Sequence, residues 1–149
     1  MRAGKSVEHR DVDALQPGLG DVRRLGATLL ADTDTARRAV AARLLGRRGF
    51  VSAYAYLRRA LWDPAEKVRA RAVEAIGALA VSQSAGELAA LYAWSGPRLR
   101  RAVLQAVHRI GCGSAFTGIL ALARDDPDAR VRGLAARAGR TSARGRRRC

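Results

Sequence analysis

The sequence has few of the residues that form disulfide frameworks and metal sites. Among 149 residues it contains two cysteines and two histidines. Cys112 and Cys149 cannot form a disulfide framework, so we expect both thiols to be reduced. His108 and Cys112 lie one helical turn apart, but a closed zinc site needs about four ligands and a catalytic site about three. We therefore expect no metal and no other cofactor.

Long apolar runs and catalytic motifs are also absent. No run approaches the roughly 18 residues that a membrane-spanning helix needs, and no apolar stretch follows the basic start to form a signal peptide. These absences predict a cytoplasmic protein that does not enter membranes. No serine lies in a nucleophile elbow, no acid and base are paired, and Gly4-Lys5-Ser6 lacks the rest of a phosphate-binding loop. We expect no catalytic residue and no enzymatic activity.

Acidic residues and lysines are scarce relative to arginine. The chain has 13 acidic residues against 28 basic ones, of which 26 are arginines, and its net charge is +15. A GC-rich bacterial genome explains arginine in place of lysine, but it does not explain the excess of basic over acidic residues. Without the five arginines of residues 140–149 the net charge is still +10. The folded part is therefore basic, which favours an acidic partner, either protein or nucleic acid.

What the sequence does contain is a repeat. Its most regular members are Arg38, Arg69, Arg100 and Arg132, in steps of 31, 31 and 32 residues. Small or apolar residues follow each arginine at helical spacing: Ala41, Ala72, Val103 and Ala135, then Leu44, Ala75, Ala106 and Ala138. Six residues before each arginine stand Asp32, Asp63, Trp94 and Asp126. A period of this length predicts stacked helical units.

These columns resemble the HEAT repeat, and the short period resembles the HEAT-like repeats of phycobilin lyases. The resemblance covers about residues 21–140, is strongest at 63–77 and 125–136, and departs at Arg37 and Trp94. It implies an all-α fold, a short right-handed α-solenoid of about four HEAT-like helical hairpins whose second helices line a concave face. It also implies a ladder of hydrogen bonds that ties neighbouring repeats together, with these members: Asp32, Arg38, Asp63, Arg69, Asp126 and Arg132.

The chain divides into three parts. We expect a flexible N-terminal arm at residues 1–20, a repeat domain at 21–139 and a disordered arginine-rich tail at 140–149. Gly46 predicts a left-handed helix end, whereas Asp63 and the pair Ser84 and Glu87 predict capped helix starts. No segment alternates like a strand. The expected helices cover residues 22–31, 35–45, 53–61, 64–80, 98–110, 115–124 and 127–137, with one more around 88–92.

Candidate binding residues follow from the ladder and from the starts of the second helices. Because Trp94 takes the place of an aspartate, we expect Arg100 either to stack on the indole or to bind an anion. Four arginines outside the ladder column could line one basic groove: Arg37, Arg71, Arg101 and Arg130. The alternative is that they form solvated faces of arginine-rich helices.

Trp62 and Trp94 occupy nearly matched positions in successive units. They are candidates for a stacking surface beside the basic groove, although packing in the core or between helices is the favoured interpretation of the aromatic residues. HEAT-like DNA glycosylases combine tryptophans with a catalytic aspartate. A lone Asp63 without a base, nucleophile or metal does not define such a site.

The sequence therefore predicts a non-enzymatic binding module, a scaffold or adaptor that engages an acidic protein partner within a larger complex. One alternative is a nucleic-acid-binding protein that uses its basic face and its tail, with an affinity that falls with salt. Bilin-lyase-like activity, implied by the resemblance alone, ranks last. Because no polar capping repeat follows the last unit, we expect its end, with Leu134, to dock on another subunit or a second copy.

Overall fold

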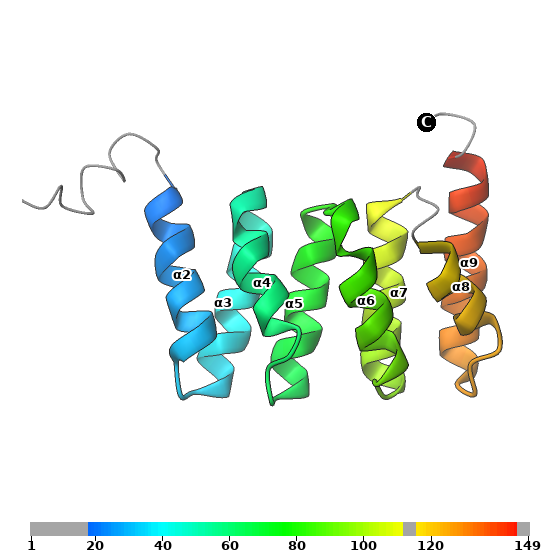
Figure 1. Cartoon of the computed structure of the whole chain (residues 1–149), viewed down its shortest axis with the longest axis horizontal. Coiled ribbons are helices and arrows are strands. Elements are labelled where there is room, and N and C mark those ends of the chain that lie inside the picture. The colour runs from blue at the N-terminus through cyan, green and yellow to red at the C-terminus, as the bar shows by residue number, and fades with distance from the viewer. Residues whose placement is uncertain (1–17, 112–115, 146–149) are drawn as a thin grey trace, which may run out of the picture.

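The computed structural model describes residues 18–111 and 116–145. Helices are the regular elements of these two stretches, and they form four antiparallel hairpins that stand in one row (Figure 1). The hairpins are α2 (Leu19–Ala31) with α3 (Thr35–Arg48), α4 (Tyr54–Ala60) with α5 (Glu66–Ala78), α6 (Ala85–Ala93) with α7 (Pro97–Ile110), and α8 (Thr117–Arg124) with α9 (Ala129–Gly145). Short 3-10 turns, Val51–Ala53 and Ser82–Ser84, precede α4 and α6. This architecture confirms the all-α repeat fold that the sequence predicts.

The helices form two layers, with α2, α4, α6 and α8 in one and α3, α5, α7 and α9 in the other (Figure 1). In the second layer, glycines let neighbouring backbones approach closely. A Cβ atom on Gly46 would lie 2.7 Å from the Cα of Ala75, and one on Gly77 would lie 2.8 Å from the Cα of Ala106. Any larger side chain at these two positions would push the second helices apart.

Gly46 therefore has a different role from the predicted one. The sequence predicts a left-handed helix end at this residue, but α3 continues to Arg48 and ends at Gly49, whose φ is 74°. Gly46 is buried inside the helix, against α5. The prediction is wrong because a glycine can serve either as a left-handed cap or as a point of close helix contact.

One apolar core runs through all four hairpins. The large side chains that are fully buried include Leu29, Leu45, Leu57, Ile76, Leu88, Leu104, Phe116 and Ile119. Burying a side chain of this size stabilises the fold by about 1.5–3 kcal/mol relative to leaving it exposed. Because each hairpin buries its apolar side only against its neighbours, the stability of the stack depends on the contacts between successive repeats.

The starts of α5 and α6 differ from the predicted caps. The N-cap of α5 is Ala65, and the carboxylate of Asp63 accepts a hydrogen bond from the Ala65 N–H at 2.9 Å, within the turn before the helix. Ser84 is the N-cap of α6, but its hydroxyl donates to the carbonyl of Val81 at 2.6 Å and accepts nothing from the helix. The prediction for Asp63 is wrong, whereas Ser84 occupies the predicted N-cap position but makes no capping bond. Both short polar side chains bond to the turn instead.

The last helix is longer than predicted. The sequence predicts a helix end near Arg137 and a disordered tail from residue 140, whereas α9 continues to Gly145. Ala135 and Ala138 of this helix are buried, and no proline interrupts the alanine- and arginine-rich sequence that follows, so the helix persists. Residues 19 and 20 of the predicted arm form the start of α2, and Gly18 is its N-cap. The rest of the arm, residues 112–115 and residues 146–149 lie outside the described residues, and so do both cysteines.

Candidate functional site

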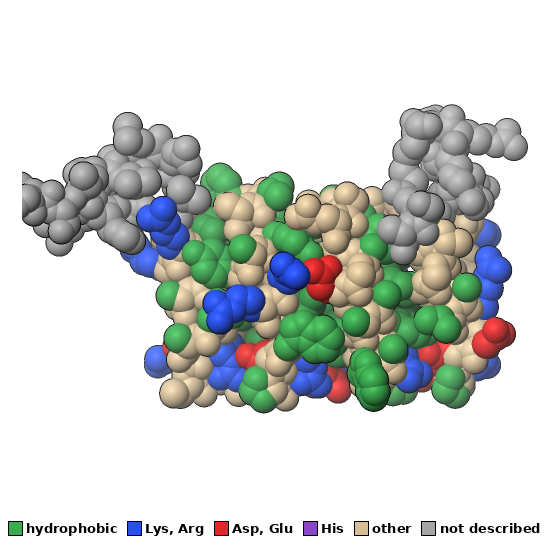
Figure 2. Space-filling model, in the orientation of Figure 1, with side chains coloured by type: hydrophobic (Ala, Val, Ile, Leu, Met, Phe, Trp, Pro, Cys, Tyr) green, Lys and Arg blue, Asp and Glu red, His purple; other side chains and the backbone are tan. Residues whose placement is uncertain are grey.

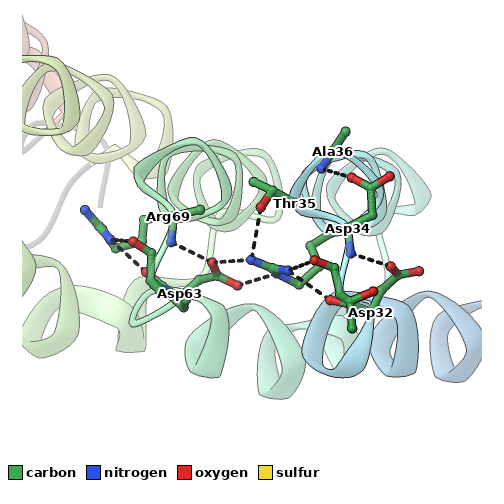
Figure 3. A network of polar contacts seen from close by, with 10 residues as sticks. Asp32, Asp34, Thr35, Ala36, Asp63 and Arg69 are labelled. Carbon is green, nitrogen blue, oxygen red and sulfur yellow. Dashed lines mark hydrogen bonds and ion pairs between the residues drawn. The ribbon is translucent and has the colours of Figure 1, made fainter.

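Aspartates and arginines link successive repeats at the turns between first and second helices. Arg38 of α3 donates from Nε to Oδ2 of Asp63 at 2.8 Å and from Nη2 to Oδ1 at 3.1 Å (Figure 3). Its Nη1 donates to the carbonyl oxygens of Asp32 and Thr33, in its own repeat, at 2.9 and 3.2 Å. The hydrogen bond to Asp63 raises the pKa of Arg38. One arginine thus holds its own turn and the carboxylate of the next repeat.

A second link joins the third and fourth repeats. Nη1 of Arg100 donates to Oδ2 of Asp126 at 3.1 Å, and the hydroxyl of Tyr92 donates to the same oxygen at 2.6 Å. Oδ1 of Asp126 accepts from the N–H of Asp128 at 2.9 Å. Asp126 is only 4% exposed. Burial alone would raise its pKa, but the hydrogen bonds and the charge of Arg100 outweigh burial and lower the pKa.

The direction of these links corrects the prediction for Arg100. Arg38 and Arg100 each bind the aspartate of the next repeat, so the aspartate that is missing at Trp94 is missing for Arg69 and not for Arg100. Arg100 is bound to Asp126, and its guanidinium carbon lies 5.6 Å from the centre of the Tyr92 ring. The aromatic partner of Arg100 is therefore Tyr92, and its charge already has a carboxylate partner.

Arg69 keeps the contacts to its own turn but lacks a carboxylate partner. Its Nη1 donates to the carbonyl oxygens of Asp63 at 2.7 Å and Pro64 at 3.0 Å. In the part of the chain that the structure describes, no carboxylate lies within ion-pair distance of Arg69. In Figure 3 its side chain extends along the stack beyond Asp63, away from the turn at Asp32.

The two outer members of the predicted ladder make local contacts only. Arg132 donates from Nη1 to the carbonyl oxygens of Asp126 at 2.7 Å and Pro127 at 3.0 Å. Asp32 accepts a hydrogen bond from the N–H of Asp34 at 2.8 Å. Among the described residues, the ladder therefore has two charged links between repeats. They join the first repeat to the second and the third to the fourth, so the ladder has no charged link between the second and third repeats.

A basic groove runs along the second layer of helices. It consists of two hollows that share Gln105 as a lining residue: a narrow part of about 320 Å³ between α5 and α7, and a wide part of about 690 Å³ between α7 and α9. All of the lining residues that the structure describes belong to second helices. Among the described residues that line it, Glu74 alone is acidic, and it already forms an ion pair with Arg71 at 2.7 Å. The Lys, Arg and His side chains of the basic groove are Lys67, Arg71, Arg98, Arg101, His108, Arg109, Arg137 and Arg140.

The structure brings two of the four predicted groove arginines together. Arg71 and Arg101 both line the narrow part, between α5 and α7. Arg37 lies outside the groove at the start of α3, 3.8 and 3.9 Å from two aspartates, and Arg130 is exposed at the start of α9, also outside. The prediction misses residues that recur at helical spacing along α7 and that this spacing could have revealed. They are Arg98, Gln105, His108 and Arg109.

The two tryptophans lie on the surface, at the turns that carry the ladder. Trp62 is 56% exposed and Trp94 is 88% exposed. Packing in the core is therefore the wrong interpretation for these two rings, although Tyr54, Tyr92 and Phe116 are buried. Figure 2 shows large hydrophobic side chains among basic ones along the lower part of the molecule. Neither tryptophan lines the basic groove, so the predicted stacking surface is separate from it.

The described residues also bear on metals, membranes and the last repeat. Within residues 18–111 and 116–145, no three metal-binding side chains converge. In the same stretches, no helix is both long and apolar enough to cross a lipid bilayer. Leu134, which we expect at a docking end, lines the wide part of the basic groove beside α7.

The hairpins and their Asp–Arg links define an α-solenoid of stacked helical repeats. The family model for HEAT repeats matches the chain over residues 22–106 and again over residues 63–139. The chain therefore belongs to the HEAT-repeat family, as its repeat columns predict.

Comparison with solved structures supports this assignment. The chain is similar to one in the complex of CpcE and CpcF of phycocyanin lyase from Nostoc sp. PCC7120, with a TM-score of 0.72 and 25% sequence identity. The match covers 94% of this chain and 62% of that chain, so this chain spans less than two thirds of the length of its structural neighbour. No curated protein sequence matches the chain.

Proposed function

We propose that this protein is a non-enzymatic HEAT-repeat scaffold or adaptor that binds an acidic protein partner through the basic groove. The observation that carries the proposal is the charge of the groove: its cationic side chains come from α5, α7 and α9, and its one acidic lining residue is already paired. Complementary charge speeds association and selects the partner. A stack of packed helices fixes the backbone positions from which these side chains extend, so the backbone need not be ordered on binding.

Two observations favour a protein partner over a nucleic acid. Within the described stretches, no aromatic side chain lines either part of the basic groove, whereas single-stranded nucleic acids gain much of their affinity by stacking bases on aromatic rings. The similar solved structure is a complex of two proteins, CpcE and CpcF. Both observations support a groove that binds carboxylates of another protein.

The proposal is tested by reversing charge in the narrow part of the groove. The full chain carrying Arg71→Glu and Arg101→Glu is titrated with a fluorescent Glu-rich peptide at physiological salt. We expect the dissociation constant to rise at least about tenfold, which is a loss of about 1.4 kcal/mol, with little change in melting temperature. Arg24→Glu with Arg59→Glu changes the net charge equally on the exposed first layer. Equal weakening by this control pair would contradict a specific groove.

Nucleic-acid binding is the second candidate, and the presence of basic hollows at two successive helix interfaces, with Gln105 common to both, favours it. The same variants are titrated with a nonspecific DNA duplex and a single strand across a salt series. A chain that ends at Gly145 keeps α9 complete and tests the remaining arginines of the tail. Duplex binding tighter than peptide binding, lost in the groove variant and kept in the shortened chain, would make nucleic acid the partner.

Phycocyanin-lyase-like activity is the third candidate and rests on the similar solved structure alone. Transfer of a bilin to phycocyanin by the purified chain would support it and would contradict the non-enzymatic assignment. We further propose a cytoplasmic location, which fractionation of cells that express the tagged full-length chain would test.

A further inference from the structure

The ladder carboxylates are held by the same kinds of donor in two repeats. Asp63 accepts hydrogen bonds from Arg38, in the preceding repeat, at 2.8 and 3.1 Å, and from the N–H of Ala65, two residues further on, at 2.9 Å. Asp126 in the fourth repeat likewise accepts from the preceding repeat's arginine at 3.1 Å and from the N–H two residues further on at 2.9 Å. At both of these ladder positions, the carboxylate therefore lies between the arginine of the preceding repeat and a backbone N–H of its own turn, and at Asp126 the Tyr92 hydroxyl is a further donor.

The third repeat has the matching arginine and the matching backbone N–H, but it has Trp94 in place of a carboxylate at the ladder position. Arg69 is oriented through Nη1 by the carbonyl oxygens of its own turn, at 2.7 and 3.0 Å, as Arg38 is at 2.9 and 3.2 Å. The backbone N–H two residues after Trp94 belongs to Gly96, and a Cβ atom on Gly96 would meet nothing within 4 Å. Trp94 is 88% exposed, so its indole does not fill this position.

We infer that Arg69 and the N–H of Gly96 bind a carboxylate from an acidic segment of a protein partner, which completes the ladder between the second and third repeats. The inference rests on the proposed function, because it assigns a second contact to the same class of partner. The Nε and Nη2 atoms of Arg69 form a fork that matches the two oxygens of one carboxylate, in the geometry that Arg38 uses toward Asp63.

The two exposed tryptophans favour particular residues next to the bound Asp or Glu in the partner segment. Trp94 occupies the ladder column itself, and Trp62 directly precedes Asp63, whose carbonyl oxygen orients Arg69. Both rings are largely exposed, at 88% and 56%. An apolar residue next to the bound Asp or Glu would bury surface against these rings, which adds affinity to the charged contact.

The first test supplies the carboxylate from the chain itself. Trp94→Asp should complete the ladder and raise the melting temperature of the full chain by about 3 °C relative to Trp94→Asn, which has the same shape without the charge. The gain should disappear when both variants also carry Arg69→Gln. Equal melting temperatures for the Asp and Asn variants, or a gain that persists with Arg69→Gln, would overturn the inference.

The second test supplies the carboxylate from a peptide. The full chain is titrated by calorimetry with a capped peptide of about eight residues that carries one Asp between two Leu residues, and with its Asn counterpart. We expect the Asp peptide to bind about tenfold more tightly, a preference lost with Arg69→Gln and with Trp94→Asp. Binding should also change the fluorescence of the chain, whose two tryptophans are Trp62 and Trp94. Equal affinities, or no binding of either peptide, would overturn the inference.

The groove variant separates this inference from the proposed function. Arg71→Glu with Arg101→Glu should keep the preference for the short Asp peptide while it weakens binding of the longer Glu-rich peptide. If the preference depends on these two arginines and survives Arg69→Gln, the ladder site is wrong and the proposed function stands. If the preference depends on Arg69 while the groove variant binds the Glu-rich peptide normally, the proposed function is wrong and the ladder site stands.

Discussion

Replacing Asp126 with alanine should destabilise the stack strongly. The side chain is 4% exposed and accepts hydrogen bonds from the Tyr92 hydroxyl, the Arg100 guanidinium and the N–H of Asp128. Alanine would leave all three donors without this acceptor. An unsatisfied buried donor costs about 1–3 kcal/mol, and breaking a buried charged pair costs about 3–5 kcal/mol. The Arg100 side chain is 24% exposed, so water can solvate part of its charge once the carboxylate is gone. We therefore expect a loss at the lower end of this range, about 3 kcal/mol in the free energy of unfolding.

Urea unfolding followed by circular dichroism measures this loss. Asp125→Ala is the matched control, because Asp125 is an exposed neighbour of the same type and should cost less than about 0.5 kcal/mol. Tyr92→Phe removes one hydrogen bond of the network and should cost about 1 kcal/mol. A loss below about 1 kcal/mol for Asp126→Ala, or one equal to that of the control, would refute the argument that the network stabilises the last interface.

Three further predictions concern acid, a strained residue and self-association. Because folding lowers the pKa of Asp126 below its ordinary value of 3.8, its contribution should be fully present above that pH and lost as the pH falls through the folded pKa. The difference in unfolding free energy between wild type and Asp126→Asn should therefore shrink only in strong acid, and a difference that grows in acid would contradict this. Ala80 has φ of 53°, in the left-handed region that Gly49 and Gly111 occupy at 74° and 89°; Ala80→Gly should raise the free energy of unfolding by about 1 kcal/mol, and Gly49→Ala should lower it. Docking of the last repeat on a second copy should appear as a mass that rises with concentration in light scattering, and equal masses for wild type and Leu134→Glu would contradict it.

Most of the fold could be predicted because the repeat columns combine a fixed period with helical spacing. The limits of the helices could not be predicted as well. Gly46 lies where a glycine can end a helix, and only the neighbouring helix decides that it is a contact point, where an added Cβ atom would lie 2.7 Å from the Cα of Ala75. The sequence after Arg137 has few apolar residues, but it also has no proline, and helix propensity together with the buried Ala138 extends α9 to Gly145.

The ladder residues could be predicted, but the direction of the ladder could not. An aspartate lies six residues before Arg38 in its own repeat and another lies 25 residues after it in the next, and both spacings fit the same period. Only the stacking of the hairpins shows that the arginine bonds to the carboxylate of the next repeat and to the carbonyl of its own. Without that direction, the missing aspartate is assigned to Arg100, although it is Arg69 that lacks a carboxylate.

Because the ladder arginines bond to the next repeat, α5 carries both the ladder site at Arg69 and part of the basic groove. This arrangement leads to a last prediction. Arg69 faces the ladder edge, whereas Lys67 and Arg71 of the same helix line the basic groove. An acidic segment that passes the start of α5 can therefore reach both sites. For a Glu- and Leu-containing peptide of about 20 residues, Arg69→Gln and Arg71→Glu should then weaken binding by less in combination than the sum of their separate effects, because losing one anchor frees the segment from the other. Strictly additive losses would mean that the edge and the groove bind separate segments, each with a carboxylate of its own.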